Sequence, residues 1–483
     1  MRGLCIMRKL SASILAIIVL AAAVLLISPY IIGLKLSDKL QTQLKDLNTP
    51  ELNIKLISFH NGWFKSDATI STTLNIYNSV ADHTSINKKL NVTFYHGFIV
   101  PVEKDNLKKY TLGYASTALK IQPDQDSSLN VSMLLTLENH MKITVFAKNY
   151  NSKNATNAIS IKDLNSNFML YTNKNNQRTL SGTASLASSL FDEKNSSKVN
   201  FENGSLSIDS KKIDGLWYGT HNLNIGTINI IENDDSKITA DDFRLSANQE
   251  KAADKINGAM TISLKALSFG TTQLSNFDTA LSFKDLDIQS AKEIARHTDT
   301  INTPQHVLSL LPKITKLFGK GFTAAIDHFR IDTDKGPIHA SLTLTIPSAK
   351  PGDATLNYLI THAVATGKLN ISKPLVIKLL ADSIESKMTD KEDRQSAEQQ
   401  ANKTVAYWIQ NSMFDYDANH DMLSLNYQFK GGKSYINGVA PNFSLPTPDE
   451  KDTHKQVKDK TDVNKITEKH NAIETPTTGT AQP

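Results

Sequence analysis

The feature that most constrains the fold of this chain is a long alternation of apolar and polar residues. Between positions 64 and 76, lysine, aspartate and threonine alternate with the apolar residues Phe64, Ala68, Ile70, Leu74 and Ile76. A period of two with one apolar face is typical of a half-buried antiparallel strand. The pattern recurs with turn residues at spacings of roughly 8–12 residues, which indicates an all-β architecture. The expected strands cover residues 90–100, 127–139, 142–149, 157–172, 179–191, 198–210, 221–233, 258–270 and 277–288.

Hairpins are predicted where turn residues separate two extended runs. Asn61-Gly62 is the strongest such signal, because both positions of a two-residue turn favour a positive φ. Two more hairpins are expected over 324–346, turning at Asp334-Lys335-Gly336, and over 422–438, turning at Gly431-Gly432. The segments 215–219 and 267–270 hold similar places between strands, but they differ too much to predict an internal repeat.

Five segments have the spacing of helices. Leu36, Leu40, Leu44 and Leu47 form an apolar stripe, which predicts a short amphipathic helix over 36–47 that packs on the folded domain in preference to a lipid surface. The other helical segments are expected at 288–297, 304–318, 374–388 and 395–413. The predicted class is mainly β with a few helices (α+β), built as a large antiparallel sheet, elongated or curled, over 35–440. The mixed charges of 441–483 lack an apolar period and predict a disordered tail.

An uncharged apolar segment, residues 10–34, precedes this domain. It exceeds the roughly 20 residues that an α-helix needs to cross a bilayer. Arg2, Arg8 and Lys9 come before it, so the positive-inside rule keeps residues 1–9 in the cytoplasm and places 35–440 on the other side. A cleavable signal peptide is the alternative, but apolar residues continue beyond the small residues at 21–23. We expect an uncleaved single-pass anchor.

Charge and cysteine usage narrow the class of protein further. The formal net charge is +5, and three of these charges precede the apolar segment, so the remainder lacks the dense basic patch of a nucleic-acid binder. The single cysteine, Cys5, also precedes the segment. Because a eukaryotic secreted domain of this length usually carries disulfides, their absence favours a bacterial protein with its bulk in the periplasm.

Three segments carry a resemblance to a known family. They are Phe59 to Ala68, Phe94 to Phe98 and Leu423 to Gly438, and residues 308–344 are also similar. In this order and spacing they resemble the YdgA-like family of bacterial inner-membrane-anchored periplasmic proteins of unknown function, over residues 8–440. That family usually has proline where Phe98 stands. The resemblance implies a location and a common fold, and it implies no reaction and no catalytic residues.

Histidines and an acidic loop are the candidates for metal binding. His60 and His96 each adjoin a glycine turn and could meet across a sheet, although a hydrogen-bonded turn histidine is the simpler interpretation. Residues 415–421 place side-chain oxygens at every second position, as calcium loops do. His420 and Asn426 stand where such a loop needs glycine and glutamate, so a polar turn between helix and strand is favoured. We predict no metal site and no cofactor.

Catalytic patterns are equally sparse. Ser85 and Lys88 have the S-x-x-K spacing without its partner motifs, in a segment expected to be a loop. Asp234, Asp235, Asp241 and Asp242 are interpreted as turn residues. Trp217-Tyr218 and Trp408 are expected in the core rather than as ligand platforms. No nucleophile, base and orienting residue converge, so no catalytic residues are predicted and we expect a protein that is not an enzyme.

Three functional hypotheses follow. The first is a binding protein that holds lipid or another hydrophobic ligand of the cell envelope on the apolar face of an open sheet, beside the membrane. Its structural alternative is a closed sandwich with an ordinary core. The second is an envelope scaffold that recruits a protein partner through edge strands and the tail. The third is a hydrolase. Nucleic acid is excluded as a partner.

Overall fold

The computed structural model describes residues 29–440 apart from short gaps. These gaps are residues 39, 43, 46–47, 49–51, 78–82, 105–106, 125, 139, 154–156, 174–176, 194–196, 233–235, 271, 296–317, 351–352 and 387–393. The chain divides into two units, Met1–Ala440 and Pro441–Pro483. The second unit, and with it the expected tail, lies outside the described residues.

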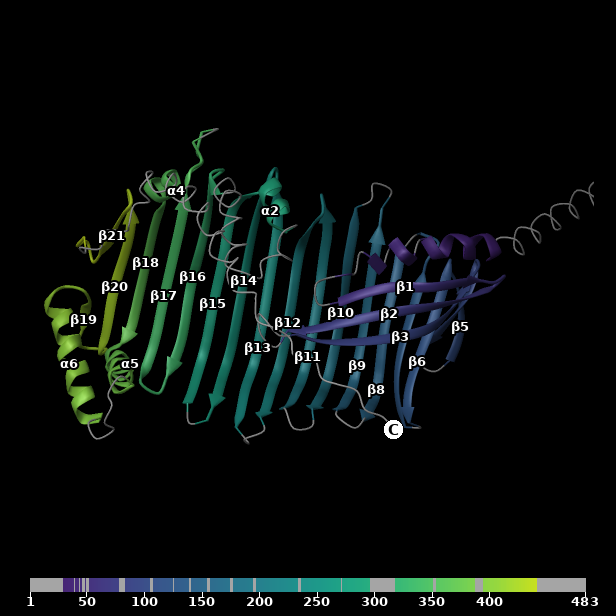
Figure 1. Cartoon of the computed structure of the whole chain (residues 1–483), viewed down its shortest axis with the longest axis horizontal. Coiled ribbons are helices and arrows are strands. Elements are labelled where there is room, and N and C mark those ends of the chain that lie inside the picture. The colour runs from purple at the N-terminus through teal and green to yellow at the C-terminus, as the bar shows by residue number, and fades with distance from the viewer. Residues whose placement is uncertain are drawn as a thin grey trace, which may run out of the picture. The chain divides into compact units, whose positions relative to one another are not determined.

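One antiparallel sheet dominates the first unit (Figure 1), which confirms the predicted mainly-β class. Nineteen strands of the described residues belong to it, and β1 to β3, β6 to β18 and then β20 pair successively as antiparallel neighbours. The strands are β1 (Leu52–Asn61), β2 (Lys65–Tyr77), β3 (His83–His96), β6 (Ala115–Asp124), β7 (Ser127–Leu135), β8 (His140–Lys153), β9 (Asn157–Thr172), β10 (Arg178–Glu193), β11 (Ser197–Ile213), β12 (Leu216–Glu232), β13 (Lys237–Ala252), β14 (Lys255–Phe269), β15 (Thr272–Asp287), β16 (Phe322–Thr333), β17 (Gly336–Ile346), β18 (Val364–Ser372), β19 (Asp415–Asp417), β20 (Met422–Lys430) and β21 (Lys433–Ile436). A separate hairpin pairs β4 (Ile99–Lys104) with β5 (Leu107–Leu112).

Four local predictions are wrong. The strand expected over 90–100 is interrupted at 97–98, because β3 ends at His96 and β4 begins at Ile99 in a separate hairpin. Asn61 is the last residue of β1 and pairs with Ser66, so the turn is the longer loop Gly62–Phe64 and not Asn61-Gly62. The segment with Ser85 and Lys88 belongs to strand β3 and is not a loop. Asp241 and Asp242 lie inside β13, a strand that the alternation did not reveal.

A row of left-handed residues crosses the sheet and explains the error in β13. Asp163, Asn203, Asp242 and Asn276 have φ angles between 50° and 55°, and they lie on every second strand from β9 to β15. The residues just before them share one continuous register row, Lys162↔Ser188↔Glu202↔Thr227↔Asp241↔Ala266↔Ser275. Asp and Asn tolerate this conformation better than other side chains do. Along this row of the sheet, a left-handed residue therefore recurs on every second strand.

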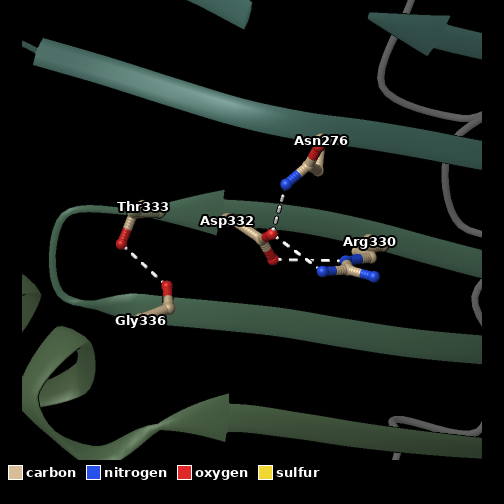
Figure 2. Close-up of polar contacts among 5 residues, drawn as sticks. All are labelled: Asn276, Arg330, Asp332, Thr333 and Gly336. Atoms are coloured by element: carbon tan, nitrogen blue, oxygen red, sulfur yellow. Dashed lines mark hydrogen bonds and ion pairs between the residues drawn. The ribbon is translucent and has the colours of Figure 1, made fainter. Parts of the chain in front are cut away.

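Figure 2 shows how one member of the row is held. The Asn276 amide donates to Oδ2 of Asp332 on β16 across 2.8 Å. Arg330 donates to both oxygens of the same carboxylate, at 3.3 and 2.9 Å. These bonds replace the ladder pairs that are interrupted between Ser275 and Asp278.

The described helices lie close to the expected positions. They are α2 (Ile288–Ala295), α5 (Lys373–Glu385) and α6 (Arg394–Gln410), where helices over 288–297, 374–388 and 395–413 are expected. Helix α4 (Leu356–His362) was not predicted. Residues 304–317 of the expected helix 304–318 lie outside the described residues.

The N-terminal helix begins earlier than its leucine stripe suggests. Residues 29–38, 40–42 and 44–45 are helical. Leu36 and Leu40 are buried against the sheet, which confirms packing on the folded domain. Ile32 is buried too, so the last turn of the expected 10–34 anchor also packs on the sheet. Residues 10–28 lie outside the described part, in which no helix is long and apolar enough to cross a membrane.

The core divides into clusters at the two ends of the sheet and a smaller cluster where Ile288 of α2 packs with Tyr218 of β12 and Ile256 of β14. Only Phe94–His96 of β3 pair with β6, and Figure 1 shows β1 to β3 running across β8 to β12. Side chains of β2 and β3 therefore share a cluster with Met141 and Leu170 of β8 and β9. At the other end, residues of α5 and α6 pack on Ile371 and Leu423, and residues of α4 pack near Phe322 and Ile346.

Candidate ligand-binding surface

Between these covered ends, the strands β12 to β17 present one apolar face. Register places Ala247, Met260, Leu281, Ile326 and Leu342 in one row across β13 to β17. Because residues two apart in a strand share a face, the row of Gln249, Gly258, Phe283, Ala324 and Leu344 lies on the same side. Almost every position of these two rows is aliphatic, aromatic or glycine.

The two rows enclose a hollow of about 620 Å³. This volume falls within the roughly 300–1,000 Å³ typical of small-molecule sites. Small residues line it at Ala247 and Ala324, and longer side chains line it at Met260, Leu281 and Phe283. A Cβ on Gly258 would lie 2.4 Å from the Phe283 ring, so the ring rests directly over the glycine. The alternation of small and large residues creates the hollow.

The polar residues of the lining are His221, Asn248 and Gln249 on β12 and β13 and Ser282 on β15, so most of them lie at one end of the hollow. His221 of β12 lies there, with its Nε2 2.9 Å from the hydroxyl of the buried Ser210 on β11. Gln249 lies on the neighbouring strand β13, paired with Gly219. No aspartate, glutamate, lysine or arginine is among the lining residues. The surface therefore offers hydrogen bonds at one end and apolar contact elsewhere.

The opposite face of the same strands is polar. Asn248 lies beside Ala247 on the other face and is exposed, and so is Thr261 beside Met260. Ser246, Thr261 and Ala280 continue that face in register. The two faces of these strands therefore differ in polarity.

Both predicted arrangements of the sheet are present in different parts. The β1–β3 layer makes a closed sandwich with β8 and β9, as the alternative hypothesis requires. Over β12 to β17 the hollow is open among the described residues. Its far edge meets the cluster around α4, to which Ala324 and Leu344 also belong.

The two turn histidines do not come together. His60 lies in β1 opposite Asp67 and is exposed, whereas His96 is buried at the end of β3. Among the described residues, no group of three histidine, cysteine or acidic side chains is placed to hold a metal.

His96 instead joins the N-terminal helix to the sheet. Its Nδ1 lies 2.7 Å from the Pro29 carbonyl, and its Nε2 lies 2.9 Å from the Ser66 hydroxyl. Burial lowers the pKa of His96 from its usual value of 6.5, and hydrogen bonds from the backbone oppose that change. Ser66 also contacts Asn61, whose Oδ1 lies 3.0 Å from the hydroxyl. This network connects the N-terminal helix with β1, β2 and β3.

The acidic loop forms a hairpin turn between β19 and β20. The Asp417 carboxylate accepts from the backbone of Asn419 and contacts His420 at 2.7 Å. Tyr416 donates to Asp421 across 2.8 Å. These carboxylates are engaged within the turn, which joins two strands and not, as expected, a helix and a strand.

The aromatic residues expected in the core are there. Tyr218 is buried beside Ile256 and Ile288. Trp217 packs against the cluster beneath the β1–β3 layer, and Trp408 packs between α6 and the sheet, 5.9 Å from the Phe414 ring.

Comparison with known families gives the chain its relatives. A family model described as "Bacterial protein of unknown function (DUF945)" matches residues 7–441. The chain belongs to this bacterial family. Comparisons with curated proteins and with solved structures found no match. The residues that match the DUF945 model include the whole sheet, the residues that line the hollow and every described helix.

Sequence reasoning missed the lining residues of the hollow individually. It predicts an apolar face for the strands over 258–270 and 277–288, which supply Met260, Leu281 and Phe283. Ala247 went unnoticed because β13 was not predicted. The signal that could have found it is the small-to-large alternation across neighbouring strands, which appears only when their register is known.

Proposed function

We propose that this DUF945 protein binds the acyl chain of an envelope lipid, or a similar hydrophobic ligand, in the hollow over β12 to β17. The observation that carries the proposal is the open apolar hollow of about 620 Å³ with no charged lining residue. Monomeric proteins rarely leave a large apolar surface without a binding role. An uncharged chain-like ligand satisfies such a surface, because it replaces water there and needs no ion pair.

The arrangement of polar groups suggests an orientation for the ligand. His221 and Gln249 lie at the β12–β13 side, and the lining toward β17 is aliphatic. A lipid glycerol or headgroup oxygen would lie near His221, and its acyl chain would run over Met260 and Leu281 toward Leu342. Ser210, the hydroxyl partner of His221, is buried and is not among the residues that line the hollow, so the proposed role is binding and not catalysis.

We also propose that residues 10–34 anchor the protein in the bacterial inner membrane. In this proposal residues 1–9 are cytoplasmic and the sheet is periplasmic, next to its lipid source. The uncharged segment, the basic residues before it and the cysteine-free domain support this placement. The three segments similar to the YdgA-like group support membership of that narrower group.

The test is to fill the hollow with a larger side chain and to measure how much lipid purifies with the protein. Ala247→Trp places an indole in the hollow, and Thr261→Trp places the same group at an exposed position of the opposite face as the matched control. The full chain is purified from membranes in mild detergent, and lipids are extracted and measured per mole of protein by mass spectrometry. We expect wild type and Thr261→Trp to carry lipid, and Ala247→Trp to lose most of it. Equal lipid in all three proteins would overturn the proposal.

A photo-crosslinking amino acid at Met260 identifies the occupant in cells. Crosslinks to phospholipid support lipid binding. Crosslinks to another envelope protein would instead support the scaffold hypothesis, and crosslinks to residues 304–317 of the same chain would show an intramolecular contact. Either of these last two outcomes, without lipid adducts, contradicts the proposal.

A further inference from the structure

The outward face of the N-terminal helix changes character at one position. Tyr30, Ile31 and Leu34 are exposed on it, and Leu34 is 52% accessible. From Lys35 onward the exposed residues of the same helix are polar, for example Asp38 and Gln41. The buried stripe of Ile32, Leu36 and Leu40 continues across the change. The buried face of the helix is therefore apolar on both sides of Lys35, whereas its exposed face changes from apolar to polar at Lys35.

The loop between β1 and β2 brings two more exposed aromatic residues to this level. Trp63 and Phe64 are each about half exposed, at 51% and 53%. The Trp63 ring centroid lies 5.3 Å from that of Tyr30, in a tilted arrangement. The Phe64 carbonyl accepts from the backbone of His96, which fixes the loop against the end of β3. The aromatic groups are therefore held outward by an ordered backbone.

The β4–β5 hairpin supplies a third group of exposed apolar residues. Ile99 pairs with Leu112, and Tyr110 lies two residues further along the same face. Ile99 is 64% accessible, Leu112 67% and Tyr110 72%. Val100, on the other face, is completely buried. The hairpin adjoins the helix, because Gly97, two residues before Ile99, lies against the Pro29 ring.

These three groups form one surface around Pro29, which we call the entry patch. Its members are the helix residues at 30, 31 and 34, the loop residues at 63 and 64, and the hairpin residues at 99, 110 and 112. In water such a surface would be unfavourable, since each apolar side chain exposes area that a soluble protein usually buries or scatters. Pro29, which lies against Gly97, belongs to the uncharged segment 10–34.

We infer that the entry patch inserts into the interfacial region of the lipid bilayer and seats the sheet against the membrane. Tyrosine and tryptophan favour this region because their rings combine an apolar body with a polar group. The change from Leu34 to Lys35 marks the level at which the helix leaves the lipid. The inference rests on the proposed membrane anchor, and it adds a second, peripheral contact that orients the domain.

The test measures the depth of Trp63 in a bilayer. The full chain carries Trp217→Phe and Trp408→Phe, so that Trp63 is its single indole, and it is reconstituted into phosphatidylethanolamine–phosphatidylglycerol vesicles containing phosphatidylcholine brominated at defined acyl carbons. A second protein keeps only Trp408, in helix α6, as the matched control. We expect shallow bromines to quench Trp63 to roughly half its intensity or less, and Trp408 to stay unquenched, because interfacial insertion is only ~5–10 Å deep.

Flotation separates failure of the patch from failure of the anchor. If the chain does not float with the vesicles, the proposed anchor is wrong and the inference fails with it. If the chain floats and Trp63 is quenched no more than Trp408, the anchor stands and the entry patch is overturned. As a second variant, Ile99→Ser combined with Leu112→Ser should leave flotation unchanged and reduce Trp63 quenching; unchanged quenching would exclude these hairpin residues from the lipid contact.

Discussion

His96 and Ser66 face each other across strands β3 and β2, with 2.9 Å between the imidazole Nε2 and the hydroxyl oxygen. Because the Pro29 carbonyl can only accept, His96 donates to it from Nδ1, and its neutral form accepts at Nε2 from the Ser66 hydroxyl. The Ser66 hydroxyl also lies 3.0 Å from Oδ1 of Asn61, at the end of β1. This chain of bonds fixes the helix to the sheet beside the entry patch.

The first prediction concerns pH. Burial lowers the pKa of His96 in the folded protein below its value in the unfolded chain, which is about 6.5. Above that pH the residue is neutral in both states, and its contribution to the free energy of unfolding is fully present. As pH falls below 6.5 the unfolded chain takes up the proton first, and the free energy of unfolding decreases until folded His96 is also protonated. Urea unfolding of wild type should show a lower midpoint at pH 5.5 than at pH 7.5.

His96→Gln is the control for this titration, since glutamine keeps a polar side chain without an ionisable group. The variant should be less stable than wild type at pH 7.5, and the gap between the two proteins should narrow toward pH 5.5. A gap that stays constant over this range would show that His96 does not titrate on unfolding.

The second prediction concerns Gly33, where the helix crosses closest to the sheet. A Cβ there would lie 2.1 Å from the Asn61 Oδ1 and 2.6 Å from the His96 ring. Gly33→Ala should therefore force the helix outward and destabilise the protein by about 1–3 kcal/mol. Thermal unfolding measures this, with the exposed Lys35→Ala in the same helix as the matched control. If both variants melt like wild type, the helix is not tightly packed at Gly33.

Particular residues show how far the sequence predicts this fold. The alternation predicts the antiparallel sheet, because a period of two requires nothing beyond neighbouring residues. The alternation does not predict a strand at Asp241 and Asp242. Aspartate is a common turn residue, and the sequence alone does not distinguish a turn from a strand in which Asp242 has a left-handed conformation. Pairing on both sides, with β12 and β14, keeps this stretch in the sheet, and that information lies outside the local sequence.

The candidate site is predictable only in outline. The sequence predicts an apolar face, but which strands are covered depends on segments distant in the chain, such as Ala68 of β2 packing near Met141 of β8. For the same reason the turn at Asn61 was misplaced: Ser66 and His96 hold Asn61 in the strand, and His96 is remote in sequence. The entry patch likewise combines three segments that only the fold brings together.

The third prediction links a single glycine to ligand binding. In Gly258→Ala the new methyl group would lie 2.4 Å from the Phe283 ring, so the ring must move away from residue 258 and into the hollow. We expect less lipid to purify with this variant, with the secondary structure unchanged by circular dichroism. Gly204→Ala on β11 is a matched control, because its Cβ meets only ordinary contacts at 3.5 Å. Wild-type lipid content in Gly258→Ala would show that Phe283 does not border the bound ligand.

The last prediction separates backbone conformation from hydrogen bonding in the left-handed row. Asn276 has a φ of 51° and donates to Asp332, which also accepts from Arg330. Asn276→Gly loses the bond but suits the conformation, so we expect a cost of about 1 kcal/mol or less. Asn276→Val loses the bond and places a β-branched residue at positive φ, which should cost about 2–4 kcal/mol. Chemical unfolding of both variants gives the comparison, and equal destabilisation would mean that the hydrogen bond to Asp332, rather than the left-handed backbone, selects asparagine at this position.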